Sequence, residues 1–431
     1  MNAVSRPATH RTIDASRASS LLAQFRQTRA LTRALAAPLS AEDAMVQSMD
    51  DASPAKWHLA HTTWFFERFV LMADARYVPF DPAWDYLFNS YYNSVGPMHA
   101  RSRRSMLSRP SFERVRAYRA AVEEQMEALL AREVLSTELL DVVQLGLQHE
   151  QQHQELLLTD IRHALWSNPL QPAYRDDLPS EPGSVQPLRW HARDEQVVQI
   201  GADAWPQAEA FAYDNESPRH RTLVAAHALA SRPVNNDEFQ AFIDADGYRT
   251  PALWLSDGWA VVQKEGWQRP LYWHEDGARE FTLGGWRERD PAAPACSLSL
   301  FEADAFARWT GARLPTEAEW EHAATGADIQ GNFAEDGWLH PHAAPLAGVG
   351  VTQLFGDVWE WTGSAYLPYP GFASWPGALG EYNGKFMNAQ WVLRGGSCAT
   401  PCRHVRASYR NFFPSHARWQ FAGVRLAKDS T

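Results

Sequence analysis

The chain has 431 residues, of which 45% are hydrophobic and 21% are charged, so it is long enough for two globular domains with apolar cores. A formal net charge of −11 argues against a nucleic-acid partner, because binding phosphates requires a basic surface. The N-terminal segment lacks the apolar core of a secretion signal, and no run of about 18 apolar residues follows it. We therefore expect a soluble, cytoplasmic protein without a membrane partner.

Residues 15–168 have the pattern of four long helices. Apolar residues recur at three- and four-residue steps in SRASSLLAQFRQTRALTRALA, SPAKWHLAHTTWFFERFVLMAD, SFERVRAYRAAVEEQMEALLAR and STELLDVVQLGLQHEQQHQELLLTDIRHALW. Such a series predicts an up-and-down bundle, whose core is a common place for a metal ion.

Residues 169–190 contain five prolines and predict a linker. Residues 191–428 then change to short strand patterns rich in glycine and aromatic residues, with clear helices only in LFEADAFARWTG and TEAEWEHAAT. A helical part followed by a strand-rich part predicts the α+β fold class.

Histidines on two of the predicted helices can hold one metal ion. His149 and His153 are four residues apart and therefore share one face of their helix. A third ligand should come from another helix of the bundle, which offers His58 and His61. Three neutral imidazoles without an acid beside them suit Zn, Cu or Fe, and the spacing does not choose among these metals.

The same stretch also matches a zinc-protease motif, because residues 149–153 (HEQQH) fit H-E-x-x-H. The extended form of that motif needs Gly and His at the positions of Leu156 and Thr159, and the next acidic residues fall in the proline-rich segment. We therefore prefer a different metal site, in which Glu150 and Glu155 are partners that fix the tautomers of the imidazoles.

The segment between the second and third helices, DYLFNSYYNSVGPMHARSRRSMLSRPSF, is too long for a bundle turn. It contains the tyrosine pair Tyr91 and Tyr92, followed by four arginines. Arginine forks bind carboxylates through two hydrogen bonds, and a tyrosine hydroxyl can deliver a proton. We expect this loop to be functional, the alternative being a solvated basic loop.

With these motifs in view, the chain resembles the ergothioneine-biosynthesis sulfoxide synthases over nearly its whole length. LAH and HEQQHQE resemble a DinB-type helical bundle. RLPTEAEWE, GDVWEWT, EYNGKF, VLRGGS and YRNFF resemble the formylglycine-generating-enzyme domain, which has a C-type-lectin-like fold. The resemblance implies a DinB-like four-helix bundle at 15–168, a linker at 169–190 and a formylglycine-generating-enzyme-like domain at 191–428.

The resemblance also implies a cofactor and a reaction. The family holds non-haem Fe(II) with three histidines, here His61, His149 and His153. It uses O2 to join a thiol sulfur to the imidazole C2 of hercynine (Nα-trimethylhistidine), giving a sulfoxide that is later cleaved to ergothioneine. Three protein ligands leave a face of the metal open for the substrates.

Residues for hercynine follow from the same resemblance. Gln152, beside one of the ligands, would contact hercynine. Asn411, Phe412 and Phe413 would line the pocket for its trimethylammonium group, because aromatic faces favour a quaternary cation.

The resemblance assigns the second substrate to the loop. Arg101 and Arg104 would clamp the carboxylate of the sulfur donor, and Tyr91 or Tyr92 would be the acid beside the iron. The YRNFF ending and the tyrosine pair look more like the branch that uses cysteine than the branch that uses γ-glutamylcysteine. The arginine loop reads RSRRS where the family has a sequence closer to RPQRG, so a selenosugar donor, as in the related selenoneine synthases, is the alternative.

Other protein classes stay open at this point. Cys398 and Cys402 follow RGGS near the place where formylglycine-generating oxidases bind copper, but that class does not need a histidine bundle. A zinc-dependent thiol transferase of the bare DinB type would not need the second domain. A lectin-like module that only binds ligands would not need histidines on two helices. We expect Cys296, Cys398 and Cys402 to be free thiols, because three cysteines cannot form a disulfide framework.

Overall fold

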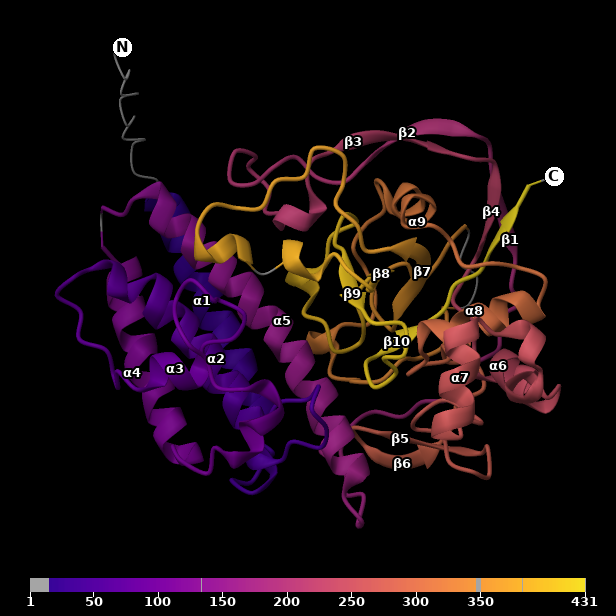
Figure 1. Cartoon of the computed structure of the whole chain (residues 1–431), viewed down its shortest axis with the longest axis horizontal. Helices are drawn as coiled ribbons and strands as arrows, with labels where there is room; N and C mark the ends of the chain where they lie inside the picture. Colours follow the sequence, from indigo (N-terminus) through magenta and orange to yellow (C-terminus); the bar gives the residue numbers. More distant parts are fainter. Residues whose placement is uncertain (1–14, 133, 346–349, 382, 431) are drawn as a thin grey trace. The chain divides into compact units, whose positions relative to one another are not determined.

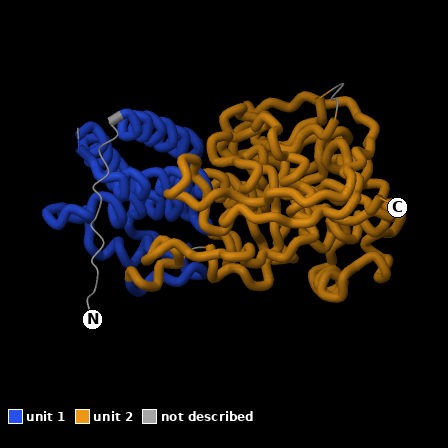
Figure 2. The backbone as a smooth tube through the Cα atoms, turned by 90° about the horizontal axis from the view of Figure 1, so that it is seen from above, with its two compact units in different colours: residues 1–46, 53–90, 96–153 blue, residues 47–52, 91–95, 154–431 orange. Residues whose placement is uncertain are grey.

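The computed structural model describes residues 15–132, 134–345, 350–381 and 383–430 (Figure 1). The chain divides into two compact units, which Figure 2 shows in two colours. The first unit consists of residues 1–46, 53–90 and 96–153, and the second of residues 47–52, 91–95 and 154–431. Helix α5 (Thr137–Ser167) contributes to both, since the division falls after His153.

The first unit is helical, and its long helices are the four that the apolar periodicity predicts. They are α1 (Ala15–Ala36), α2 (Ala55–Phe69), α4 (Phe112–Leu130) and the first part of α5. The short helix α3 (Trp84–Phe88) and the 3-10 helix η3 (Arg101–Met106) lie in the long loop after α2. The Ser111 side chain starts α4 by accepting a hydrogen bond from the backbone N–H of Arg114.

A buried ion network fixes the rotation of α5 within this unit. Glu150 of α5 is fully buried and accepts hydrogen bonds from Arg29 and Thr32 of α1 and from Arg119 of α4. Burial alone would raise the pKa of Glu150, but Arg119 and Arg29 lower it to about 2, so the carboxylate is ionised. Because Glu150 is bonded to α1 and α4, the histidine face of α5 is turned toward α2.

Glycine lets α5 and α2 approach closely beside the histidines. A Cβ atom at Gly146 would lie 2.6 Å from Cε1 of Phe66, which is shorter than a carbon–carbon contact allows. A larger residue at this position would therefore push the two helices apart and separate the histidines that they carry.

The second unit is rich in β-strands. Its four-stranded sheet has the order β10-β7-β8-β9, in which β10 and β7 are parallel and the other pairs are antiparallel. The strands of this sheet are β7 (Trp359–Ala365), β8 (Trp391–Arg394), β9 (Asn411–Phe413) and β10 (Ala422–Gly423). Strand β9 contains the last three residues of YRNFF and is an edge strand of this sheet, where Phe412 lies opposite Val392 of β8.

The described residues of the second unit also form three smaller sheets, in which all pairs are antiparallel. One has the order β1-β4-β11, with β1 (Trp190–Arg193), β4 (His227–Ala230) and β11 (Ala427–Asp429). The others are the pairs β2 (Gln196–Ile200) with β3 (His220–Val224) and β5 (Arg279–Thr282) with β6 (Gly285–Glu288). The expected linker at 169–190 contains no helix or strand up to residue 189, and its last residue, Trp190, begins β1.

The two helices predicted in this part are present as α8 (Leu300–Trp309) and α9 (Glu317–Ala324). Each begins with a capping box, in which a Ser or Thr and a Glu three residues later satisfy one another's backbone N–H groups. Two further helices, α6 (Asn236–Asp244) and α7 (Ser256–Glu265), were not expected. Among the described residues, no helix has a stretch long and apolar enough to cross a membrane.

Candidate metal centre

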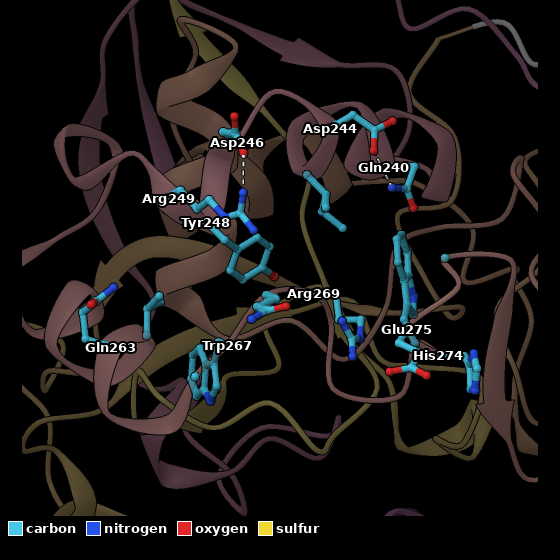
Figure 3. Close-up of a pocket in the computed structure, with 16 residues that line it drawn as sticks. Gln240, Asp244, Asp246, Tyr248, Arg249, Gln263, Trp267, Arg269, His274 and Glu275 are labelled. Carbon is cyan, nitrogen blue, oxygen red and sulfur yellow. Dashed lines mark hydrogen bonds and ion pairs between the residues drawn. The ribbon is translucent and has the colours of Figure 1, made fainter.

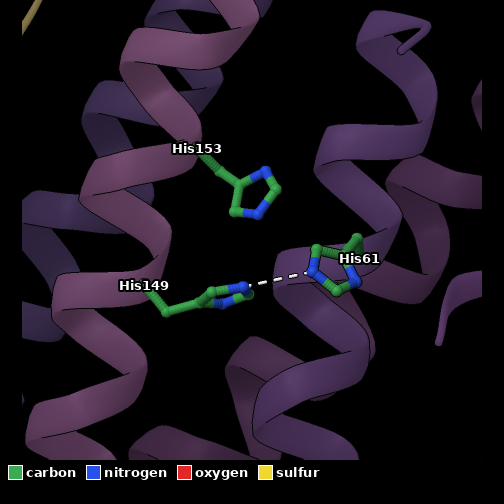
Figure 4. A group of neighbouring side chains, drawn as sticks. All are labelled: His61, His149 and His153. Atoms are coloured by element: carbon green, nitrogen blue, oxygen red, sulfur yellow. Dashed lines mark hydrogen bonds between the residues drawn. The ribbon is translucent and has the colours of Figure 1, made fainter. Parts of the chain in front are cut away.

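Three buried histidines meet inside the first unit (Figure 4). His61 comes from α2, and His149 and His153 come from successive turns of α5. Their candidate ligand atoms all lie within 4.8 Å of one another, and the Nε2 atoms of His61 and His149 are 3.1 Å apart. The sequence prediction of a group built from two helices is therefore matched by the geometry.

The other ring nitrogens of His61 and His153 turn outward to protein partners, whereas Nδ1 of His149 is buried without a hydrogen-bond partner among the described residues. His61 donates a hydrogen bond from Nδ1 to the carbonyl oxygen of Phe88 at 2.6 Å. His153 places Nδ1 at 2.8 Å from Nδ1 of His58, which is itself buried. Both contacts leave Nε2 as the nitrogen that faces the group, the arrangement that outer partners of metal ligands typically impose. His58 is thus a partner of the group, and His61 is the member contributed by α2.

Burial keeps these imidazoles neutral. It lowers the pKa of His149 to about 3, and burial together with the neighbouring His149 ring lowers the pKa of His61 and of His153 well below the ordinary value. A neutral imidazole has the lone pair that a metal ligand requires. Three such nitrogens without a carboxylate fit Fe, Zn or Cu, and not Mg or Ca, which prefer oxygen ligands.

The two acids expected to orient the histidines do not do so, and that expectation is wrong. Glu150 bonds to α1 and α4, whereas Glu155 accepts hydrogen bonds from Trp359 Nε1, Ser397 Oγ and Thr400 Oγ1 at 2.5, 2.8 and 2.6 Å. The reason is helix geometry: a residue one or two positions from a ligand points to another side of the helix. The zinc-protease interpretation fails on the same ground, because its glutamate must face the metal.

The predicted arginine pair is divided between two environments. Arg101 is exposed, whereas Arg104 is buried with its guanidinium carbon 3.3 Å from the centre of the Trp57 ring. Arg104 donates from its two terminal nitrogens to Ser53 Oγ at 2.7 Å and Ser90 Oγ at 2.9 Å. If Arg101 and Arg104 bound one carboxylate together, these bonds of Arg104 would have to rearrange.

Trp57 connects Arg104 with the histidines. Its ring stacks on that of His61, with the centres 4.5 Å apart and the planes inclined by 15°. Gln152, expected to contact hercynine, is half-buried on α5 next to His153. Trp57 was not assigned a role from the sequence, although it lies four residues before His61 on one helix, a spacing that could have suggested it. His58 was considered only as an alternative ligand to His61.

The other predicted site residues belong to the second unit, where an aromatic stack joins two of them. The rings of Tyr91 and Phe386 pack edge-to-face with their centres 5.2 Å apart, and the rings of Phe386 and Phe412 stack with their centres 5.8 Å apart. The ring of Phe412 in turn stacks on that of Tyr366, with the ring centres 4.1 Å apart. The structure thus groups Tyr91 with Phe412, whereas the sequence did not indicate Phe386 despite its place in the EYNGKF motif.

The remaining residues of that set are nearby in sequence to members of the stack. Tyr92 is buried, and Asn411 accepts a hydrogen bond from the backbone N–H of Phe412 at 2.9 Å. Phe413 packs against Trp419 with the ring centres 6.3 Å apart.

The cysteines are free thiols, as expected. Burial and the neighbouring thiol of Cys296 raise the pKa of Cys398, which is fully buried. Cys402 is only half-buried, and its pKa is raised by burial and by Glu335, whose carboxylate accepts a hydrogen bond from its backbone N–H. Because Cys398 and Cys402 lie in different surroundings, the structure gives no support to a copper site shared by the two.

A surface pocket of about 520 Å3 lies in the second unit (Figure 3). Its lining includes aromatic residues such as Trp267 and Trp273 and the acids Asp244, Asp246 and Glu275. None of the residues expected to form the site lines it. We therefore do not assign it to the chemistry of the histidines.

Comparison with known proteins agrees with the division into a helical and a strand-rich part. The DinB superfamily matches residues 24–157, and the sulfatase-modifying factor enzyme 1-like domain matches residues 187–349 and 342–430. A hercynine oxygenase of Mycobacterium tuberculosis is 33% identical over 88% of this chain and 91% of its own length.

Two further relatives cover less of the chain. Ergothioneine biosynthesis protein 1 of Schizosaccharomyces pombe is 27% identical over 51% of this chain and 28% of its own length. A formylglycine-generating enzyme of Mycobacterium tuberculosis is 28% identical over 40% of this chain and 75% of its own length. The hercynine oxygenase of Mycobacterium tuberculosis covers most of both chains, and on that similarity the chain belongs to the hercynine oxygenase family, with a DinB-like helical region and a sulfatase-modifying-factor-like β-rich domain.

Proposed function

We propose that this protein is a non-haem Fe(II) enzyme that uses O2 to join a thiol sulfur to the imidazole C2 of hercynine, in ergothioneine biosynthesis. Family membership supports the substrate and the use of oxygen. The observation that carries the metal assignment is the buried group of three neutral imidazoles, in which protein partners hold the outer nitrogens of His61 and His153. Bound at His61, His149 and His153, iron would supply the reduction of O2, with positions left open for substrates.

The proposed reaction balances without a further reductant. Hercynine loses the hydrogen on C2, the thiol loses its proton, and a C–S bond forms between the two. One oxygen atom of O2 becomes the sulfoxide oxygen, and the other leaves as water with the two hydrogens. The C–S bond formation and the sulfur oxidation each release two electrons, and together they reduce one O2.

The roles of the chain's other residues are part of the proposal. Gln152 contacts hercynine, and Asn411, Phe412 and Phe413 take its trimethylammonium group. Stacking of Phe412 on Tyr366 fixes the plane of one ring of this pocket, and a rigid aromatic face suits a quaternary cation.

We further propose that Tyr91 or Tyr92 provides the acid. A phenol donates its proton readily only to a strongly basic group, because its ordinary pKa is about 10. The tyrosine would therefore act late, when negative charge has developed on oxygen, and not on the resting substrates.

The sulfur donor is cysteine in this proposal, with Arg101 and Arg104 as its carboxylate contacts. The bonds of Arg104 to Ser53 and Ser90 favour a second candidate, in which a selenosugar is the donor and a C–Se bond forms. A sugar has no carboxylate and would leave both serine bonds in place.

Turnover assays distinguish these donors. Protein loaded with Fe(II) under anaerobic conditions would receive hercynine and O2 together with cysteine, γ-glutamylcysteine or a selenosugar, and products would be identified by mass spectrometry. A hercynyl-cysteine sulfoxide is expected, and a selenium adduct alone would move the protein to selenoneine synthesis. Hercynine left unchanged with every donor would refute the proposed function.

A further inference from the structure

The tyrosine pair lies in a tight turn with an unusual backbone conformation. Tyr91 has φ = 70°, the left-handed region that bulky residues rarely adopt. The backbone N–H of Asn93 donates to the Tyr91 carbonyl at 3.2 Å, and that of Val95 donates to the Tyr92 carbonyl at 3.1 Å. Such a conformation persists only where neighbouring groups hold it, so the contacts of residues 91–95 decide how both tyrosines are presented.

Two charged side chains of the EYNGKF motif hold the backbone of this turn. The Glu381 carboxylate accepts a hydrogen bond from the Asn93 N–H at 2.8 Å with one oxygen and from the Ser94 N–H at 3.0 Å with the other. The Lys385 ammonium donates to the carbonyl oxygen of Tyr91. The negative Glu381 thus binds two N–H groups of the turn, and the positive Lys385, four residues later, binds one of its carbonyl oxygens. We call Glu381 and Lys385 the clamp.

The clamp is anchored within the second unit. Between its two residues, Asn383 is buried and donates from Nδ2 to the buried Asp214 carboxylate at 2.6 Å. Directly after it, Phe386 lies between the rings of Tyr91 and Phe412. The motif therefore connects the turn that presents the tyrosines with the ring proposed to contact the trimethylammonium group.

We propose that Glu381 and Lys385 are positioning residues that hold Tyr91 and Tyr92 in the geometry needed for proton delivery, an inference that rests on the proposed function. Neither residue exchanges a proton with substrate. Their charges fix the backbone of residues 91–95, and the rotation at Tyr91 directs the two phenol rings. Release of the clamp frees Tyr91 to return to an ordinary conformation and removes the acid from its place.

Hydrogen exchange tests the clamp without any turnover. In Glu381→Ala, peptides covering residues 91–95 should exchange about tenfold faster than in the wild type, because two amides lose a charged acceptor. Glu381→Gln keeps one acceptor oxygen and should give an intermediate rate. The matched controls are Glu265→Ala and Lys264→Ala, which change an exposed pair whose 3.0 Å contact lies within α7. Unchanged exchange at 91–95 in Glu381→Ala would overturn the proposal.

Product analysis then tests the positioning role. Glu381→Ala and Lys385→Ala should keep the Fe(II) stoichiometry and hercynine affinity of the wild type. They should nevertheless shift the products in the same way as whichever of Tyr91→Phe and Tyr92→Phe alters them. Combining Glu381→Ala with that Tyr→Phe change should add no further shift, since both act on one group. Wild-type products from both clamp variants, or additive effects in the double variant, would overturn the proposal. If the wild type leaves hercynine unchanged, the proposed function fails, and the exchange rates alone decide on the clamp.

Discussion

His58→Phe should weaken metal binding although His58 is not a ligand. The Nδ1 atoms of His58 and His153 are 2.8 Å apart, and both rings are buried. In the metal-free protein, the His153 ring can move its proton to Nε2 when its partner is lost. Once Nε2 binds a metal, Nδ1 must carry the proton, so the variant leaves a buried N–H without an acceptor.

The expected magnitude follows from this difference between the two states. An unsatisfied buried donor costs about 1–3 kcal/mol, and here that cost falls on the metal-bound state alone. Since about 1.4 kcal/mol corresponds to a tenfold change, the Fe(II) dissociation constant should rise about 10- to 100-fold. The Oδ1 atom of asparagine lies near the position of an imidazole Nδ1, so His58→Asn should recover most of the affinity.

Anaerobic competition with a chromogenic chelator measures this constant. His99→Phe is the matched control, because His99 lies in the same unit and its Nε2 lies 3.0 Å from the carbonyl oxygen of Arg103, outside the histidine group. Circular dichroism and urea unfolding would establish that each variant is folded. A folded His58→Phe protein whose dissociation constant stays within about twofold of the wild type would refute the reasoning.

Three further predictions concern the acid, the ion network and pH. Either Tyr91→Phe or Tyr92→Phe should retain iron and hercynine binding but alter the product on mass spectrometry, and unchanged products in both would contradict the acid role. Glu150→Gln removes the fully buried carboxylate that pairs with Arg29 and Arg119, which keep their contacts with Glu123, and should cost about 3–5 kcal/mol in urea unfolding. A stable but inactive variant would point to a catalytic acid instead. In the metal-free fold the pKa of His149 is lowered to about 3, whereas in the unfolded chain it should be near the ordinary value of about 6.5. Above about pH 6.5 this residue is neutral in both states, and its contribution to the stability of the fold is at its highest. Stability should fall below that pH by up to about 1.4 kcal/mol per unit for this group, and His149→Gln should show a smaller slope.

The helices of the metal centre were predictable because local signals and tertiary packing agree. The apolar periodicity of residues 15–168 matches four long helices, and a spacing of four residues places His149 and His153 on one face. The choice of His61 over His58 could not come from spacing, because both residues point toward α5. The rotation of α2 against α5 decides it, and that rotation depends on packing such as the contact of Gly146 with Phe66.

Contacts between segments distant in sequence were beyond sequence reasoning. Nothing in the EYNGKF motif indicates that Glu381 binds the backbone of Asn93, because 288 residues separate them. The environment of Arg104 was also hidden, since a buried guanidinium with two serine partners has the same sequence signature as a solvated one. The roles of Glu150 and Glu155 were predicted wrongly, because residues one or two positions from a histidine point to other sides of the helix.

Iron held by the three histidines and used on hercynine is tested most directly by measuring Fe(II) stoichiometry together with O2-dependent consumption of hercynine. Both would be measured for the wild type and for His153→Ala, with Gln154→Ala as the neighbouring control. The wild type and the control should bind one Fe(II) per chain and consume hercynine, and His153→Ala should do neither. Full turnover by a metal-free His153→Ala protein would contradict the assignment of the centre.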